Sequence, residues 1–471
     1  MRPLGEAVSG AIGPEGASTV ARGRGSDAMA GRDTALNAST ALIPAGGSLG
    51  GMPAPTPRDV RPPLPTSTRG VDGSGGRAVP RQPPPVLEPA TLVDPRRWHL
   101  DPAVTFLNHG SFGARTRDLL ARQRTWQDRI EQQPIEHLGR RVREYLAPSR
   151  EAVASFLGAD PSGLGFVTNA TEGVNAALRS VAFRRGDRVV TTTHVYHAVR
   201  QTLRRLAVES GIEVVEVPVE LPIADADSIV AAIAPWLVAP TRLLLIDHVT
   251  SPTAVRMPVE RLVPIARRAG IETLVDGAHA PGMIEVDLAS LDADHYAANL
   301  HKWVGAPLGT AILWTHPRVR SRVHPNVTSH FYGEGFTTEF DWQGTRDVSG
   351  WIVAVDALKD LGRLGWDQVR AHNHALATWA HAMLVERWGS TPMTPLDGSL
   401  LGSIASIELP SAVARRFERV DQLQASLLAE HGIEIPCIEW GGRRFVRISA
   451  MVYNRPAQYE KLASAIESMA G

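Results

Sequence analysis

Short apolar segments alternate with helix-length amphipathic segments between residues 171 and 314, and this alternation limits the possible folds more than any other feature. Strands are expected at Arg188–Thr192, Glu213–Val217, Arg242–Asp247, Thr273–Val275 and Thr310–Trp314, with a short extended segment at Asp294–Ala297. Helices are expected at Thr171–Ala182, Val199–Glu209, Ser228–Leu237 and Val259–Ala269. Helices of this length between short strands indicate a mostly parallel sheet that is covered on both faces. The sequence therefore predicts an α/β fold.

The chain is expected to divide into three parts. Residues 1–95 are rich in Gly and Pro and have almost no aromatic side chains, so we expect a disordered extension. Residues 96–345 contain the alternating pattern and would form a large domain. Residues 346–471 contain long helices followed by short strands around Gly402–Glu408 and Phe445–Ser449, which predicts a smaller C-terminal α+β domain.

Composition argues against several classes of protein. The 49 basic and 49 acidic residues balance, so no general field attracts nucleic acid or an anionic membrane. With one cysteine no internal disulfide can form, and without a His-Glu-x-x-His run no metal site is expected. The longest apolar stretch, Ile229 to Ala239, is too short to cross a bilayer, and no secretory leader pattern is seen. These features predict a cytoplasmic protein without a nucleic-acid or membrane partner.

Two residues next to strands of the predicted sheet are candidates for a catalytic role. Asp276 directly follows a strand, at the end where ligands bind in parallel sheets, although a lone Asp there is more often a cap or turn residue. Lys302 lies between an expected strand and a Gly-rich turn and is followed by apolar Trp303 and Val304. A desolvated lysine has a lowered pKa and can attack a carbonyl group. The chain has only three lysines among its 49 basic residues, which favours a chemical role for this one.

The segment Thr168-Asn169-Ala170-Thr171-Glu172-Gly173 opens a predicted helix. Its polar side chains could cap the free N–H groups, or those groups could bind a phosphate. No Gly-x-Gly-x-x-Gly or Walker sequence follows a strand, so dinucleotide and NTP binding have little support. Pyridoxal phosphate (PLP) needs a lysine, a carboxylate, a phosphate site and a stacking ring, and His194 or Tyr196 could supply the ring.

The chain resembles the class-V aminotransferases, and within them the proteins similar to isopenicillin N epimerase. Seven motifs occur in family order between Phe106 and Asn454: Leu107–Gly113, Asn169–Gly173, His194–Ala198, Asp276–His279, Asn299–Trp303, Gly344–Asp347 and Val446–Ala450. The resemblance implies the PLP-dependent fold type I of aspartate aminotransferase, with a seven-stranded, mostly parallel sheet and a smaller C-terminal domain, to which the start of the large domain contributes.

The resemblance also implies roles for individual residues. The catalytic residues would be Lys302, which holds PLP as a Schiff base, Asp276 beside the pyridine nitrogen, and His279 near the O3′ oxygen. The other cofactor-binding residues would hold the phosphate or cover the ring: Ala170 (through its backbone N–H), Thr171, Asn169, Asn299 and His301 for the phosphate, and Tyr196, with His194 as the alternative, for the ring.

Three further roles concern the substrate and a second subunit. Arg447 would bind the α-carboxylate of an amino-acid substrate, a task suited to a guanidinium group. Asn108 and His109 would line the substrate mouth. Thr345 would reach the phosphate of the neighbouring subunit, which implies a homodimer with shared active sites.

The reaction at the α-carbon stays open at this point among epimerisation, transamination and β-elimination by a C–S lyase. Desulfuration through a persulfide is disfavoured because Cys437 lies in an apolar segment next to Pro436 and is expected to be a buried structural residue. Two other classes are less favoured: a binding module that has lost catalysis, and an NAD-dependent Rossmann oxidoreductase, which would need the missing phosphate-binding fingerprint.

Overall fold

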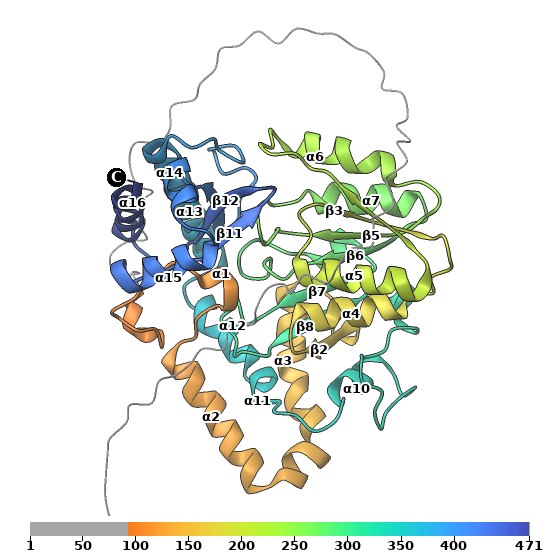
Figure 1. Ribbon diagram of the computed structural model, residues 1–471. Coiled ribbons are helices and arrows are strands. Elements are labelled where there is room, and N and C mark those ends of the chain that lie inside the picture. The colour runs from red at the N-terminus through yellow and green to blue at the C-terminus, as the bar shows by residue number, and fades with distance from the viewer. Residues whose placement is uncertain (1–92, 471) are drawn as a thin grey trace, which may run out of the picture. The chain divides into compact units, whose positions relative to one another are not determined.

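The structure is a computed structural model and describes residues 93–470, so residues 1–92 and 471, with most of the predicted extension, lie outside it (Figure 1). The largest element is a seven-stranded sheet in the order β2-β8-β7-β6-β5-β3-β4. Its strands are β2 (Leu164–Val167), β3 (Arg188–Thr192), β4 (Glu213–Val217), β5 (Thr241–Asp247), β6 (Glu272–Asp276), β7 (His295–Asn299) and β8 (Ala311–Thr315). Strand β8 is antiparallel to both of its neighbours, and the pairs among β3–β7 are parallel. The predicted α/β fold with a mostly parallel sheet is confirmed.

Helices cover both faces of this sheet because alternate strand residues point to opposite sides. In β5, Leu243 and Leu245 belong to the apolar cluster of α4 (Ala170–Ser180) and α5 (His197–Ser210). Leu244 and Ile246 belong to the cluster on the other face. That cluster includes α3 (Val142–Phe156), α6 (Ala226–Ile233), α7 (Val259–Arg268) and α12 (Ala354–Gly362). The strands are therefore buried on both faces, as their continuous apolar sequences require.

A second sheet, in the order β11-β12-β9, lies in the C-terminal part of the chain and is antiparallel. Its strands are β9 (Ile404–Glu408), β11 (Cys437–Trp440) and β12 (Arg443–Ser449). Helices α13 (Trp366–Trp388), α15 (Val420–His431) and α16 (Pro456–Ala470) share one apolar cluster with it. Strand β1 (Thr105–Phe106) pairs with β10 (Ile433–Glu434), which ties the start of the described chain to this part. The division into domains at residues 345 and 346 stays a prediction.

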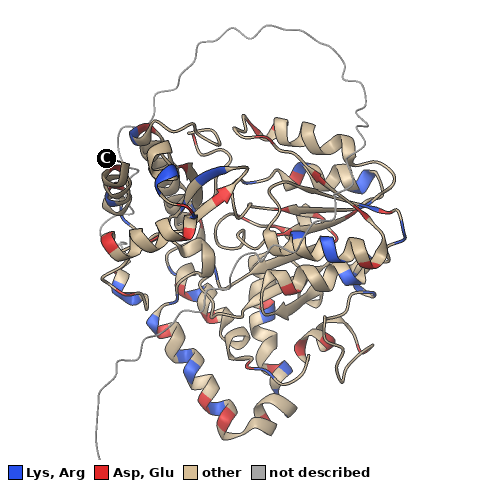
Figure 2. Cartoon of the chain, in the orientation of Figure 1, with Lys and Arg blue, Asp and Glu red and all other residues tan. Residues whose placement is uncertain are grey.

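The remaining helices connect or flank these elements. They are α1 (His109–Phe112), α2 (Arg117–Gln132), α8 (Leu288–Leu291), α9 (Pro317–Arg320), α10 (Phe336–Asp341), α11 (Ser349–Ile352) and α14 (Ser411–Arg416). Basic and acidic residues are intermingled along α2 (Figure 2). Among the described helices none is long and apolar enough to cross a membrane.

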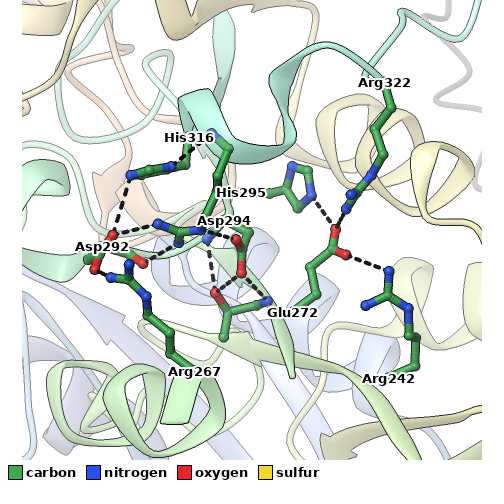
Figure 3. Close-up of polar contacts among 10 residues, drawn as sticks. Arg242, Arg267, Glu272, Asp292, Asp294, His295, His316 and Arg322 are labelled. Carbon is green, nitrogen blue, oxygen red and sulfur yellow. Dashed lines mark hydrogen bonds and ion pairs between the residues drawn. The ribbon is translucent and has the colours of Figure 1, made fainter. Parts of the chain in front are cut away.

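Charged side chains form a network of ion pairs and hydrogen bonds at the amino-terminal end of the central strands (Figure 3). Glu272, the first residue of β6, is buried; its Oε1 lies 2.8 Å from His295 Nε2 and forms an ion pair with Arg322. Arg242 Nη2 lies 3.3 Å from its other oxygen. A second group of charges continues the network beside it: Asp292 with Arg267, Arg318 and His316, and Asp294 with Arg318 and Thr273. Such pairing satisfies the buried carboxylates at this end of the sheet.

Candidate active site

A cavity of about 500 Å³ lies at the opposite, carboxyl-terminal end of β5, β6 and β7. Because these strands are parallel, their last residues, Asp247, Asp276 and Asn299, meet at one edge of the sheet and all line the cavity. Ligands of open α/β sheets bind at this edge. Nine residues predicted from the sequence line it: Asn169, Ala170, Thr171, Tyr196, Asp276, His279, Asn299, His301 and Lys302.

Lys302 lies just beyond β7, and its side chain projects toward the ends of β5 and β6. Burial, with the positive charge of Arg447, lowers the pKa of its amine from 10.5 to about 7, against the opposing effect of the two aspartates. Its Nζ lies 3.0 Å from His279 Nε2. Near neutral pH a large fraction of this amine is therefore unprotonated and able to act as a nucleophile or base.

Asp276 and Asp247 form a pair of buried carboxyl groups. They are register partners at the ends of β6 and β5, and each is about 3% exposed. Asp276 Oδ1 accepts a hydrogen bond from the N–H of Ala278 at 2.9 Å, whereas Asp247 Oδ2 has no hydrogen-bond partner among the described residues. Burial raises the pKa of both groups, and for Asp247 the charge of Asp276 adds to it. The pair has unused capacity to bind a cationic or proton-donating group.

The amino terminus of α4 forms another wall of the cavity. Asn169 is its N-cap, and its Oδ1 accepts from the N–H of Glu172 at 2.9 Å. The N–H of Ala170, which we expected to bind phosphate, instead donates to Asn299 Oδ1 at 2.8 Å. Asn299 thus fixes the helix start, and the Thr171 side chain lines the cavity beside it. The helix dipole makes this wall favourable for an anion.

The two candidates for the stacking ring lie in different environments. Tyr196, the residue before α5, is 42% exposed and lines the cavity. His194 is completely buried, with Nδ1 2.6 Å from Thr253 Oγ1 and Nε2 2.7 Å from the carbonyl oxygen of Val219. Both ring nitrogens of His194 are engaged, and His194 does not line the cavity. Tyr196 is therefore the candidate that the geometry supports.

Arg447 lies behind the cavity wall. It is 4% exposed, and its Nη1 donates to the carbonyl oxygen and to Oγ of Ser251 at 2.6 and 3.0 Å. Its Nη2 donates to Ser111 Oγ at 3.2 Å, and its Nε has no partner among the described residues. Ser111 and Ser251 themselves line the cavity. A carboxylate could reach the guanidinium by replacing these hydroxyl contacts.

Besides His194 and Arg447, three predicted residues do not line the cavity. Asn108 is buried, and its Nδ2 donates to Glu434 Oε1 at 3.0 Å. His109 is completely buried, 2.8 Å from the Tyr453 hydroxyl and 3.1 Å from the Lys302 carbonyl oxygen. The structure thus places neither at the mouth of the cavity, because Asn108 points to Glu434 and His109 points to the backbone of Lys302. Thr345 is exposed and away from the cavity.

The sequence analysis missed three polar residues of the cavity, Asp247, Ser111 and Ser251. Asp247 could have been found by the rule that singled out Asp276, since both end a predicted parallel strand. Ser111 lies inside the quoted motif Leu107–Gly113. Ser251 follows β5 by four residues, and no sequence pattern marks it.

The residues around the cavity fit PLP. A near-neutral buried amine suits an aldehyde, an unsatisfied buried carboxyl pair suits a protonated ring nitrogen, and the start of α4 suits a phosphate. The sheet and the cavity at its carboxyl edge define a PLP-dependent enzyme of fold type I.

The chain belongs to the class-V aminotransferase family, whose model matches residues 127–462. It is 33% identical to a putative L-cysteine desulfhydrase 1 of Oryza sativa subsp. japonica, over 79% of this chain and 84% of that protein. It is 32% identical to an isopenicillin N epimerase of Amycolatopsis lactamdurans, over 79% of this chain and 96% of that protein. The predicted family and the PLP cofactor are confirmed.

Solved structures support the fold. The cystine C–S lyase C-DES, in complex with its product cysteine persulfide, matches with a TM-score of 0.67 at 20% identity, over 77% of this chain and 97% of that chain. A cysteine desulfurase of Thermococcus onnurineus matches with a TM-score of 0.63 at 19% identity, over 78% of this chain and 94% of that chain.

Proposed function

We propose that the chain is a PLP-dependent C–S lyase, which removes the α-proton of an amino acid and expels a sulfur substituent from the β-carbon. One observation carries the proposal: of the three lysines, Lys302 alone lines the cavity, and its amine has a pKa of about 7. A β-elimination needs one base, and a thiolate leaves with little assistance from an acid.

Lys302 would bind the cofactor aldehyde and, when free, take the α-proton of the substrate. Asp276 would hold the ring nitrogen in its protonated form, Thr171 would bind the phosphate, and Tyr196 would cover the ring. Bound in this way, PLP supplies an aldehyde that captures the substrate amine and a ring that accepts electrons from the α-carbon. Arg447, now held by two serines, would bind the substrate carboxylate.

The bonds balance without an oxidant. With L-cysteine, the α C–H and β C–S bonds break, the electron pair from the α-carbon forms a C=C bond, and the sulfur leaves with the second pair and takes a proton as hydrogen sulfide. The remaining 2-aminoacrylate reacts with water to give pyruvate and ammonia.

No sulfur acceptor on the protein is required for this reaction. Cys437 is the first residue of β11 and is buried in the apolar cluster of the C-terminal sheet, and burial raises the pKa of its thiol to about 12. A thiol in this state is a poor nucleophile, which argues against a persulfide-forming desulfurase. Several of the relatives are named L-cysteine desulfhydrases, which supports release of the sulfur as a small product.

Epimerisation is the second candidate, because Tyr196 presents a partly exposed phenol to the cavity and could serve as a second proton donor. The isopenicillin N epimerases among the relatives agree with it.

The homodimer with shared sites and the cytoplasmic location are also proposed. The exposed position of Thr345 supports contact with a second copy, but it is the family resemblance that motivates the dimer. A relative from Arabidopsis thaliana is named as chloroplastic, so the location needs its own measurement.

The experiment incubates the PLP-loaded enzyme with L-cysteine in D2O and measures hydrogen sulfide, pyruvate and ammonia together with α-deuterated L- and D-cysteine. Equal amounts of the three products support the lyase. D-cysteine without pyruvate would support the epimerase instead, and a Lys302→Ala enzyme that retains full turnover would refute both.

A further inference from the structure

Trp303, the residue after the lysine, is completely buried and points its indole N–H at the active-site histidine. Its Nε1 donates to His279 Nδ1 at 3.4 Å, and the other ring nitrogen of His279 lies 3.0 Å from Lys302 Nζ. Trp303 also packs on the ring of His109, with 4.9 Å between the ring centroids. Three consecutive groups are thus linked in the order indole, imidazole, amine.

The direction of the hydrogen bonds in this chain follows from the chemistry of the indole. An indole N–H can donate but cannot accept, so His279 Nδ1 must be the unprotonated, accepting nitrogen. His279 is buried, which lowers its pKa well below 6.5 and keeps the ring neutral. A neutral imidazole has one proton, which must then lie on Nε2, facing Lys302. The group that accepts this proton has to be an unprotonated amine.

We propose that Trp303 is a positioning residue that fixes His279 as the Nε2–H tautomer, so that His279 donates to Lys302 and keeps its amine in the neutral, reactive form. This inference rests on the proposed function, in which the free amine is the base. Without the indole N–H, His279 could carry its proton on Nδ1. Its Nε2 would then accept a hydrogen bond from a Lys302 ammonium group and stabilise the protonated lysine.

Other charges act on the same amine and have to stay unchanged in the test. The groups that face Lys302 from the packed elements are Asp247 of β5, Asp276 of β6, Arg447 of β12, and His279 and His301 from the loops. Apart from His279, none of them contacts the Trp303 indole nitrogen, because the one hydrogen bond of this nitrogen among the described residues goes to His279.

The low lysine content makes a direct measurement possible. In cofactor-free protein with 13C-labelled lysine, three lysine signals are expected, and a Lys302→Met variant identifies the signal of interest. We expect Trp303→Phe to raise the pKa of Lys302 by about 1, a tenfold change in its proton affinity, because His279 Nε2 can then accept a hydrogen bond from the ammonium form. An unchanged Lys302 pKa in this variant would overturn the proposal.

Two controls separate the tautomer from loss of packing. Trp351→Phe removes another completely buried indole, whose N–H donates to the Gly309 carbonyl oxygen at 3.0 Å, and should leave the pKa of Lys302 unchanged. In a His279→Leu background, Trp303→Phe should no longer shift this pKa, because leucine accepts no hydrogen bond from the indole and donates none to the amine. A shift of equal size in that background would assign the effect to packing and overturn the proposal.

A further measurement needs no folded Trp303 variant. The 15N shifts of the His279 ring in the parent protein report which nitrogen has the proton, and a protonated Nδ1 would refute the inference.

The experiments can also refute the role of Trp303 and the lyase activity independently of each other. Normal cysteine breakdown with an unshifted Lys302 pKa removes the role of Trp303 alone, whereas the expected shift in a protein that degrades no amino acid removes the lyase alone.

Discussion

Replacing Lys302 with methionine should stabilise the cofactor-free protein, and the gain should depend on pH. Methionine keeps most of the side-chain volume and removes the group that folding disfavours in its charged form. The pKa of the amine is 10.5 when exposed and about 7 in the folded protein, so folding at neutral pH expels a proton at a free-energy cost.

Thermodynamic linkage gives the sign and size of this free-energy cost of folding. Because the pKa of Lys302 is lower in the folded protein, the full cost applies below pH 7 and none of it applies above pH 10.5. At pH 7.5 it amounts to about 4 kcal/mol, and at pH 9.5 to about 1.4 kcal/mol, at about 1.4 kcal/mol per pKa unit. Lys302 is partly exposed, so solvent screens its charge and these figures are upper values.

The assay is urea unfolding of cofactor-free parent and Lys302→Met proteins at pH 7.5 and 9.5, followed by fluorescence and circular dichroism. Lys359→Met is the matched control, since this lysine is exposed. We expect a higher urea midpoint for Lys302→Met, with the larger increase at pH 7.5. Equal shifts at both pH values, or none, would refute the assignment of a desolvated amine.

Three further predictions test neighbouring parts of the site. Cys437→Ala should leave the rate of sulfide release unchanged, and thiol reagents should label Cys437 only after unfolding, because its pKa is about 12; a large loss of turnover would contradict this. Gly277→Ala should destabilise the protein by about 1–3 kcal/mol in thermal unfolding, since a Cβ there overlaps the buried Tyr296 ring; an unchanged melting temperature would be inconsistent with this packing. Asp247→Asn should stabilise the cofactor-free protein at pH 8. The pKa of Asp247 is raised in the folded protein, so its carboxyl group stabilises the fold only at low pH, and this stabilisation is lost as the pH rises through the folded pKa. The gain should vanish toward pH 4, and a gain that persists there would argue against the buried carboxyl pair.

Most of the central sheet could be predicted from the sequence because apolar runs and turn residues mark strands locally. The strands Arg188–Thr192 and Glu213–Val217 were predicted with the observed bounds. The predicted helix Ser228–Leu237 was too long, since α6 ends at Ile233 and a 3₁₀ turn follows at Pro235, a residue that lacks the N–H a helix needs. The antiparallel direction of β8 could not be predicted, because alternation of side chains says nothing about strand direction.

The site shows a similar limit. Lys302 and Asp276 could be recognised because Asp276 directly follows an apolar strand and Lys302 lies just before a Gly-rich turn. The serines that hold Arg447 could not, because Ser251 and Ser111 come from parts of the chain 196 and 336 residues away. Such contacts depend on tertiary packing, as does the inward position of His109 below Lys302.

Strand β6 has a buried acid at each end, and the two acids lie in different surroundings. Glu272 is fixed by Arg242, His295 and Arg322, so the strand is anchored at that end and holds Asp276 about 13 Å away by its own length. The loops that follow the strand ends can therefore change to accommodate new substrates without moving the carboxylate. The residues that determine the chemistry therefore lie at one edge of the sheet, and the charges that anchor the strand lie at the other.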